Sequence, residues 1–221
     1  MALTKITGEG LGSLGTGNLT HGSDSGDTRF TLNSANQYTM VIKKAGDIAG
    51  QIGGGGADVL RFSNAAGATI MEMNAGQITK PLQPAFNVTK SGEQSNIAVG
   101  SVVTVTFDTE YFDQNADFGS NVFTAPVTGK YQFNVILALG AVDIDASFVE
   151  IKLVTSNRTY TTAALTPKSF DLDADYHALT GSYLVDMDAN DTSSVSIFIY
   201  QGAAQTDIRA TQSLFSGYLV A

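Results

Sequence analysis

Acidic side chains are the one class of chemically active residue that this sequence concentrates. Two groups stand out: Asp171, Asp173 and Asp175, and Asp186, Asp188 and Asp191. In the first group the acids occupy alternate positions, so a strand there would place all three carboxylates on one face. Carboxylate oxygens suit Ca²⁺, which accepts flexible coordination. Both groups are therefore candidate calcium ligands, and the competing interpretation is a solvated acidic edge that discourages aggregation of a sheet.

More specific catalytic patterns are missing from the sequence. An EF-hand loop starting at Asp171 needs Gly at its sixth position and Glu at its twelfth, where the chain has Tyr176 and Ser182. There is no Cys, and His21 and His177 belong to neither a G-x-S-x-G nor an H-E-x-x-H pattern. A glycosidase needs only two carboxylates, but a segment this rich in acids always offers a pair. We therefore expect no enzyme activity and no cofactor.

Charge and hydropathy exclude two classes of partner. The 12 basic and 21 acidic residues give a net charge of -9, whereas a free nucleic-acid binder needs cations to displace counterions. The longest strongly apolar stretch, residues 135–142, is far shorter than the roughly 20 residues of a membrane-spanning helix. Residues 1–10 lack the apolar run of a signal peptide. We therefore expect the chain neither to bind nucleic acid nor to insert into a membrane.

The two parts of the chain differ in composition. Residues 1–80 hold 15 of the 23 Gly but only three aromatic residues, and their charges cancel. Residues 81–221 hold 17 aromatic residues and the whole net charge of -9. A Gly-rich segment with few aromatics buries too little apolar area to fold alone, so it needs partner chains. Pro81 and Pro84 mark the boundary, because proline favours extended or turn conformations.

Period-two patterns predict strands throughout residues 81–221. Apolar residues alternate with polar ones in segments 103–107, 131–139, 149–153, 179–187 and 195–199, and residues 215–220 form a last short strand. Turn residues separate these segments, and no segment shows a sustained helical period. Many short strands without helices predict an all-β sandwich, barrel or jelly roll.

The N-terminal part is also β-rich but thinner. Residues 30–46 align with residues 60–76 without a gap, and each copy has the pattern of a hairpin, which predicts a weak hairpin repeat with a period of 30. Residues 1–26 contain seven Gly and are predicted to be ordered by a partner.

Two motifs in residues 81–221 are specific: Phe123 to Phe133, F-T-A-P-V-T-G-K-Y-Q-F, and Phe215 to Leu219, F-S-G-Y-L. The first resembles the F-x-A-P-x-x-G-x-Y-x-F signature, and the second the last strand, of the globular head of the complement 1q / tumour necrosis factor superfamily. Asn190 stands where a turn Gly is usual, and Asn tolerates a left-handed turn. Within the first motif, Pro126 is predicted to end a strand at a corner and Gly129 to supply the turn.

The resemblance covers residues 83–221 and implies a ten-stranded jelly roll that assembles as a homotrimer. It also implies apolar side chains along the threefold axis. Candidates for axis or core positions are Phe107, Tyr131, Phe133, Tyr218 and Val220. The sequence leaves open which of them line the axis and which fill the core.

A second resemblance concerns the N-terminus. Residues 1–6, the following Gly-rich sequence and segments 58–67 and 71–78 are similar to fibre and appendage proteins of tailed bacteriophages. The resemblance implies a virion structural fibre assembled in the host cytoplasm. Residues 1–26 would attach to a capsid or tail protein, residues 27–80 would form a stalk, and residues 81–221 would form a head that adheres to a host-surface glycan or protein.

Two other functions stay open. One is a capsid or tail decoration that stabilises its neighbours without binding a receptor. The other is a surface-glycan depolymerase. A cellular adhesin is disfavoured, because no export signal is visible.

Overall fold

A computed structural model describes residues 39–44, 47–54 and 59–221. Within these ranges the chain consists of β-strands and one short 3₁₀ helix, Pro167–Ser169, which confirms the all-β prediction. The predicted N-terminal attachment segment, residues 1–26, and the predicted stalk residues 27–38 lie outside the described residues.

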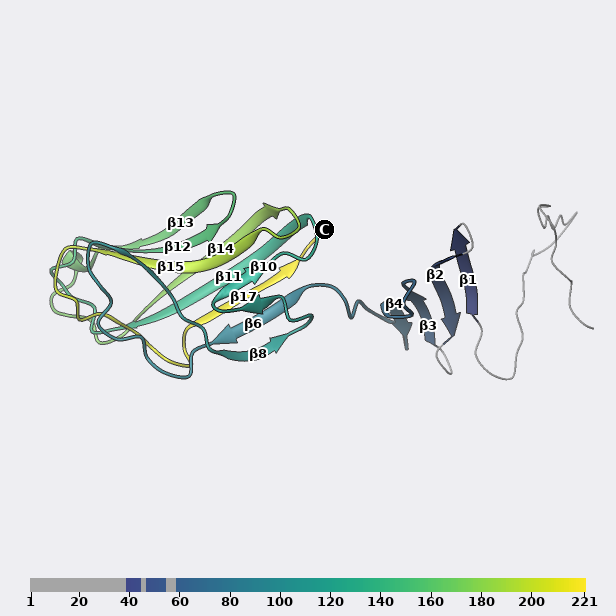
Figure 1. Cartoon of the computed structure of the whole chain (residues 1–221). Helices are drawn as coiled ribbons and strands as arrows, with labels where there is room; N and C mark the ends of the chain where they lie inside the picture. Colours follow the sequence, from purple (N-terminus) through teal and green to yellow (C-terminus); the bar gives the residue numbers. More distant parts are fainter. Residues whose placement is uncertain (1–38, 45–46, 55–58) are drawn as a thin grey trace, which may run out of the picture.

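The N-terminal strands form one antiparallel sheet in sequential order (Figure 1). They are β1 (Thr39–Lys44), β2 (Asp47–Gly54), β3 (Val59–Ser63), β4 (Thr69–Asn74) and β5 (Gln77–Thr79). Strands β3 and β4 form the hairpin expected of the second repeat copy. Strand β1 lies 30 residues before β4 and has the same length, but its expected hairpin partner lies outside the described residues. The repeat therefore stays a prediction.

The C-terminal strands form a sandwich of two sheets, as predicted (Figure 1). The β11 sheet has the order β14 (His177–Met187), β11 (Gly129–Gly140), β17 (Leu214–Leu219), β6 (Ala85–Thr89), β8 (Thr109–Asp113), with β16 (Asp207–Ile208) also paired to β11. The β15 sheet has the order β13 (Thr159–Leu165), β12 (Phe148–Thr155), β15 (Thr192–Tyr200), β10 (Val122–Thr124), β9 (Phe118–Gly119), with β7 (Val102–Thr104) also paired to β15.

Period-two alternation positions the core between these sheets. On β11 the residues from Tyr131 to Leu139 that share one parity are all buried, as the sequence pattern predicts. Aromatic rings fill the centre, where the Phe86 ring centroid lies 5.0 Å from those of Phe123 and Phe215. The Tyr131 hydroxyl donates a 2.7 Å hydrogen bond to the Val127 carbonyl, so this buried phenol keeps a partner.

Two local predictions are corrected by the structure. The strand predicted over residues 103–107 ends at Thr104, because the Thr106 and Phe107 backbone N–H groups donate to the side chains of Gln94 (3.1 Å) and Asn121 (2.7 Å) instead of to a strand. Pro126 does follow the end of β10, but Gly129 begins β11 instead of supplying a turn. A Cβ on Gly129 would lie 2.6 Å from the Ala221 carbonyl oxygen, so close approach of the C-terminal residue explains this glycine.

Candidate functional site

The outward face of the β11 sheet is the surface most suited to binding another protein. The buried residues of its strands point into the sandwich, so the alternate residues point outward. Large apolar side chains interrupt this outward face and are partly or largely exposed: Ile136 (37%), Leu184 (59%), Tyr218 (48%) and Phe112 (52%). Leu184 on β14 and Tyr218 on β17 lie on either side of Gln132 on β11, so they belong to one row across the sheet.

This face is also uncharged over much of four adjacent strands, β14, β11, β17 and β6. Outward residues carry no charge between Ala178 and Leu184 on β14, between Gln132 and Ile136 on β11, between Leu214 and Tyr218 on β17, and throughout β6. The charged pair of residues opposite each other, Lys130 and Asp186, marks one end of the face. Residues 81–221 carry a net charge of -9, so an uncharged area of this extent is a distinct feature of the domain.

Neutral hydrogen-bonding groups lie between the apolar side chains. The Gln132 side-chain amide donates to the Ser182 hydroxyl (2.9 Å), which donates to the side-chain oxygen of Asn134 (3.0 Å). On β6, two strands away from β11, the Asn87 side-chain oxygen is buried and lacks a hydrogen-bond partner. A mixture of aromatic, aliphatic and neutral polar side chains is typical of protein–protein interfaces.

The structure separates the predicted axis and core candidates into two groups. Phe107, Tyr131 and Phe133 are buried inside the sandwich and belong to its core. Tyr218 and Val220 are about half exposed at 48% and 49%, so they are the two that a partner could contact. Sequence analysis missed Phe112, Ile136 and Leu184. The sequence did contain a sign of Ile136 and Leu184, because each is an apolar residue at a strand position where the alternating pattern predicts an outward, polar side chain.

The first acidic group does not lie on a strand, which corrects the predicted alignment of its three carboxylates. Asp171, Asp173 and Asp175 lie in an irregular loop after the 3₁₀ helix, because Pro167 starts that turn and ends the strand pattern. The Asp173 carboxylate accepts hydrogen bonds from the Ile144 backbone N–H and the Gln205 amide, which lower its pKa. Asp173 thus fastens two loops together.

The second acidic group shapes a turn. Asp186 belongs to β14, and Asp188 and Asp191 flank Asn190, whose φ of 75° confirms the predicted left-handed turn. The Asp191 carboxylate accepts hydrogen bonds from the Asp188 N–H (2.8 Å), the Ser156 hydroxyl (2.7 Å) and the Asn157 amide (2.7 Å). These bonds, the first of them most strongly, lower the pKa of Asp191.

Neither group is brought together as a metal centre. Within residues 39–44, 47–54 and 59–221, no three acidic or histidine side chains are arranged to hold a metal ion. The His177 ring lies 5.7 Å from the Phe170 ring, and His21 lies outside the described residues. The calcium site therefore stays a prediction that the geometry of one chain does not support.

The outward face of the β15 sheet carries a second group of aromatic residues. The Phe148 ring lies 5.2 Å from the Tyr200 ring and 5.8 Å from the Phe198 ring, and the Lys152 ammonium lies 5.0 Å above Phe198. Tyr200 is 45% exposed. This second aromatic cluster lies on the sheet opposite the uncharged face.

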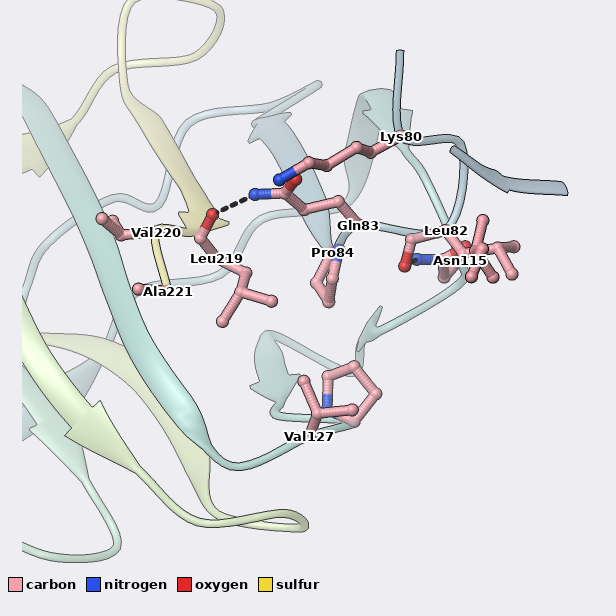
Figure 2. A pocket seen from close by; sticks show the side chains of 11 residues that line it. Lys80, Leu82, Gln83, Pro84, Asn115, Val127, Leu219, Val220 and Ala221 are labelled. Carbon is pink, nitrogen blue, oxygen red and sulfur yellow. Dashed lines mark hydrogen bonds between the residues drawn. The ribbon is translucent and has the colours of Figure 1, made fainter. Parts of the chain in front are cut away.

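An apolar pocket of about 600 Å³ lies where the C-terminus meets the segment that leads from the N-terminal sheet. Figure 2 shows Leu82, Pro84, Val127, Leu219 and Val220 around it. A 2.5 Å hydrogen bond from the Gln83 amide to the Leu219 carbonyl joins the two segments (Figure 2). No titratable pair faces this pocket in a geometry suited to acid–base catalysis, so its chemistry is that of an apolar contact.

Comparison with known proteins identifies the sandwich. The model of the C1q domain matches residues 85–220, which is more than half of the chain. The chain belongs to the C1q domain family. C1q-like domains are generally binding or structural domains.

Among solved structures, two further proteins are similar to part of this chain. The globular domain of zebrafish complement 1qA is 20% identical, with 63% of this chain and 98% of that chain covered and a TM-score of 0.44. Murine APRIL at pH 8.0 is 11% identical, with coverage of 62% and 99% and a TM-score of 0.44. No curated protein matches the chain. The described part contains no helix of sufficient length and hydropathy to span a membrane.

Proposed function

We propose that this chain is the trimeric fibre of a bacteriophage virion and that its C1q domain adheres to the host surface. The observation that carries the proposal is the uncharged apolar face of the β11 sheet within a domain of net charge -9. Three copies that pack around a threefold axis would cover this face and leave the charged surfaces in water.

The energetics favour association through this face. Apolar surface removed from water contributes about 25 cal/mol per Å², and a stable interface buries about 800 Å² on each partner. A buried charge without a partner would cost several kcal/mol, and the central outward positions contain none. Leu184 lies on the edge strand β14 and Tyr218 on the central strand β17, so a ring of three copies would pack the edge of one face against the centre of the next.

Covering the β11 sheet would leave the β15 sheet facing outward. Its aromatic cluster of Phe148, Phe198 and Tyr200 is then the surface that we assign to the host receptor. Each trimer would present three equivalent copies of it, and several fibres on one particle would raise avidity. The acidic domain favours contact assisted by cations over direct attraction to an anionic envelope.

The remainder of the proposal concerns the N-terminal segments. Residues 1–26 would bind a capsid or tail protein, and residues 27–80 would form the stalk between that anchor and the head. The support is the composition of these residues, which are rich in Gly and poor in aromatics and therefore depend on neighbouring chains for order.

Competition for adsorption tests the proposal. A large excess of the full-length protein should reduce adsorption of phage particles that carry this chain. The variant Tyr200→Ala, which keeps the β11 face intact, should compete less well than the unchanged protein, while Leu172→Ala, in an exposed loop, should compete equally well.

Two outcomes would replace the proposal with its alternatives. Unchanged adsorption, at any excess of protein, would indicate a decoration that stabilises the particle without binding a receptor. Shortened polysaccharide chains after incubation of host glycan with the protein would indicate a depolymerase.

A further inference from the structure

The N-terminal sheet has two chemically different faces. On one face, the register of the paired strands places apolar side chains next to one another in two rows. The first row is Ile52, Phe62 and Met71, and the second is Leu60, Met73 and Ile78. The alternation along β3 and β4 is strict at these positions, because a strand turns successive side chains to opposite faces.

The opposite face is more polar and electrically balanced, and it carries Val59 on β3 and Ile70 on β4 as its apolar residues. The Arg61 guanidinium donates to the Glu72 carboxylate at 2.6 Å, and these two residues lie directly opposite each other on β3 and β4. Glu72 also lies opposite Thr79 on β5. This face is therefore suited to water, and the six apolar side chains of the first face are not.

The apolar face is not covered within the described part of the chain. Leu60, Met73 and Ile78 are 40%, 40% and 60% exposed. A sheet that is apolar on one face is stable only when a second layer covers that face. The second layer must therefore come from outside the described residues.

We propose that three copies of this chain pack the apolar faces of their N-terminal sheets around a common axis, enclosing a second core that continues the trimer of the head. This inference rests on the trimeric head of the proposed function. The polar faces with their Arg61–Glu72 pairs would form the outer surface of the resulting three-sided stalk.

The connection to the head favours other copies as the covering layer. Residues 80–84 are fastened to the C1q domain, since Gln114 donates to the carbonyls of Lys80 (3.1 Å) and Gln83 (2.7 Å) and Asn115 donates to that of Leu82 (3.1 Å). Association of three heads would hold three sheets at one end, at a high effective concentration.

The charge of the N-terminal residues also favours other copies of this chain as the layer that covers the apolar face. Residues 1–80 carry six basic and six acidic side chains, so three stalks would not repel one another as a segment of high net charge would. Residues 1–38 contain seven Gly and two aromatic residues, Phe30 and Tyr38, and a covering layer built from them is the alternative that the cross-linking test below distinguishes.

Cysteine cross-linking in the full-length chain tests the inference, because the natural sequence has no Cys. In Met73→Cys the thiol lies on the apolar face, and in the matched variant Asn74→Cys it lies on the opposite face of the same strand. Mild oxidation should convert most Met73→Cys chains into disulfide-linked dimers, with the third chain of each trimer left single. A three-armed maleimide should link all three chains. Asn74→Cys should stay monomeric on a non-reducing gel in both cases.

Sedimentation equilibrium of the same samples separates the two hypotheses. A trimer in which Met73→Cys fails to cross-link, or in which Asn74→Cys cross-links equally well, overturns this inference and leaves the trimeric head intact. A monomer overturns the proposed function itself. Because Met73→Cys could disturb folding, Ile78→Cys on the same face provides a second variant with the same expected dimers, and circular dichroism verifies that each variant retains its strands.

Discussion

Phe133 on β11 and Gly217 on β17 lie directly opposite each other, and the Phe133 ring occupies the space that a side chain on Gly217 would need. A Cβ on Gly217 would lie 2.7 Å from Cε1 of Phe133 and 2.8 Å from Cε1 of Phe86. The two sequence motifs that indicated the family, ending at Phe133 and containing Gly217, are thus adjacent strands that make one packing unit.

Replacement of Gly217 by Ala should destabilise the C1q domain. The added methyl group must displace two fully buried rings, and overpacking of this kind costs about 1–3 kcal/mol. Chemical denaturation of the full-length protein, followed by tyrosine fluorescence, measures the change in the free energy of unfolding. Gly119→Ala on β9 is the control, because a Cβ there meets nothing within 4 Å. Equal stability of Gly217→Ala and Gly119→Ala would contradict the packing argument.

Much of the sandwich followed from the sequence because its strands alternate buried and exposed residues. On β11 the five apolar residues from Tyr131 to Leu139 that share a parity are all buried in the core. The errors arose where contacts between distant residues replaced regular strand pairing. After β7 the Thr106 and Phe107 N–H groups donate to the side chains of Gln94 and Asn121. In the acidic loop, Ala174 pairs with Val142 through backbone hydrogen bonds as an isolated bridge. Such contacts between distant residues leave no periodic trace in a sequence.

Replacement of Asp117 by Asn should stabilise the domain at neutral pH. Burial, and to a lesser extent the neighbouring Asp113, raise the pKa of Asp117, and its Oδ2 is buried without a hydrogen-bond partner. With a folded-state pKa above the unfolded value, the native protein binds more protons, so stability falls as pH rises through the folded pKa. Asp117→Asn should therefore have a higher Tm than the unchanged protein at pH 7 and an equal Tm below the ordinary carboxyl pKa. A lower Tm at pH 7 would contradict this account.

Asp191 should show the opposite dependence on pH. Its folded-state pKa is lowered, chiefly by the Asp188 N–H, so its contribution to stability is complete above the unfolded pKa and is lost as pH falls through the folded pKa. Asp191→Ala should lower Tm at pH 7, and the difference should shrink in acid. Thermal unfolding between pH 7 and pH 2 tests this, with the exposed loop variant Asp171→Ala as the control. A difference in Tm that is independent of pH would show that the carboxylate charge is not involved.

The candidate interface could be predicted only in part, and the reason is physical. Tyr218 was among the predicted residues, but Leu184 and Ile136 were not, because each was counted as one residue of an otherwise regular strand. These two residues form part of an interface only because neighbouring strands place further uncharged residues beside them. The strand order β14-β11-β17-β6 brings those strands together, and it pairs segments that are far apart in the chain.

Replacement of Leu184 by Asp should dissociate the head trimer. Three carboxylates would be buried or crowded near one axis, and the cost of an unpaired buried charge, about 3–5 kcal/mol, corresponds to a loss of association of at least about 100-fold. Leu172→Asp, in a loop at 71% exposure, makes the same chemical change away from the face. Size-exclusion chromatography with light scattering should show a smaller particle for Leu184→Asp only. An unaltered particle size for Leu184→Asp would place the interface elsewhere.

Sedimentation equilibrium of the unchanged full-length protein at micromolar concentration tests the central claim most directly. Three chains that share the uncharged face of the β11 sheet should sediment as a single species with three times the chain mass of 23.1 kDa. A folded species with the mass of one chain would contradict the trimer and, with it, the fibre.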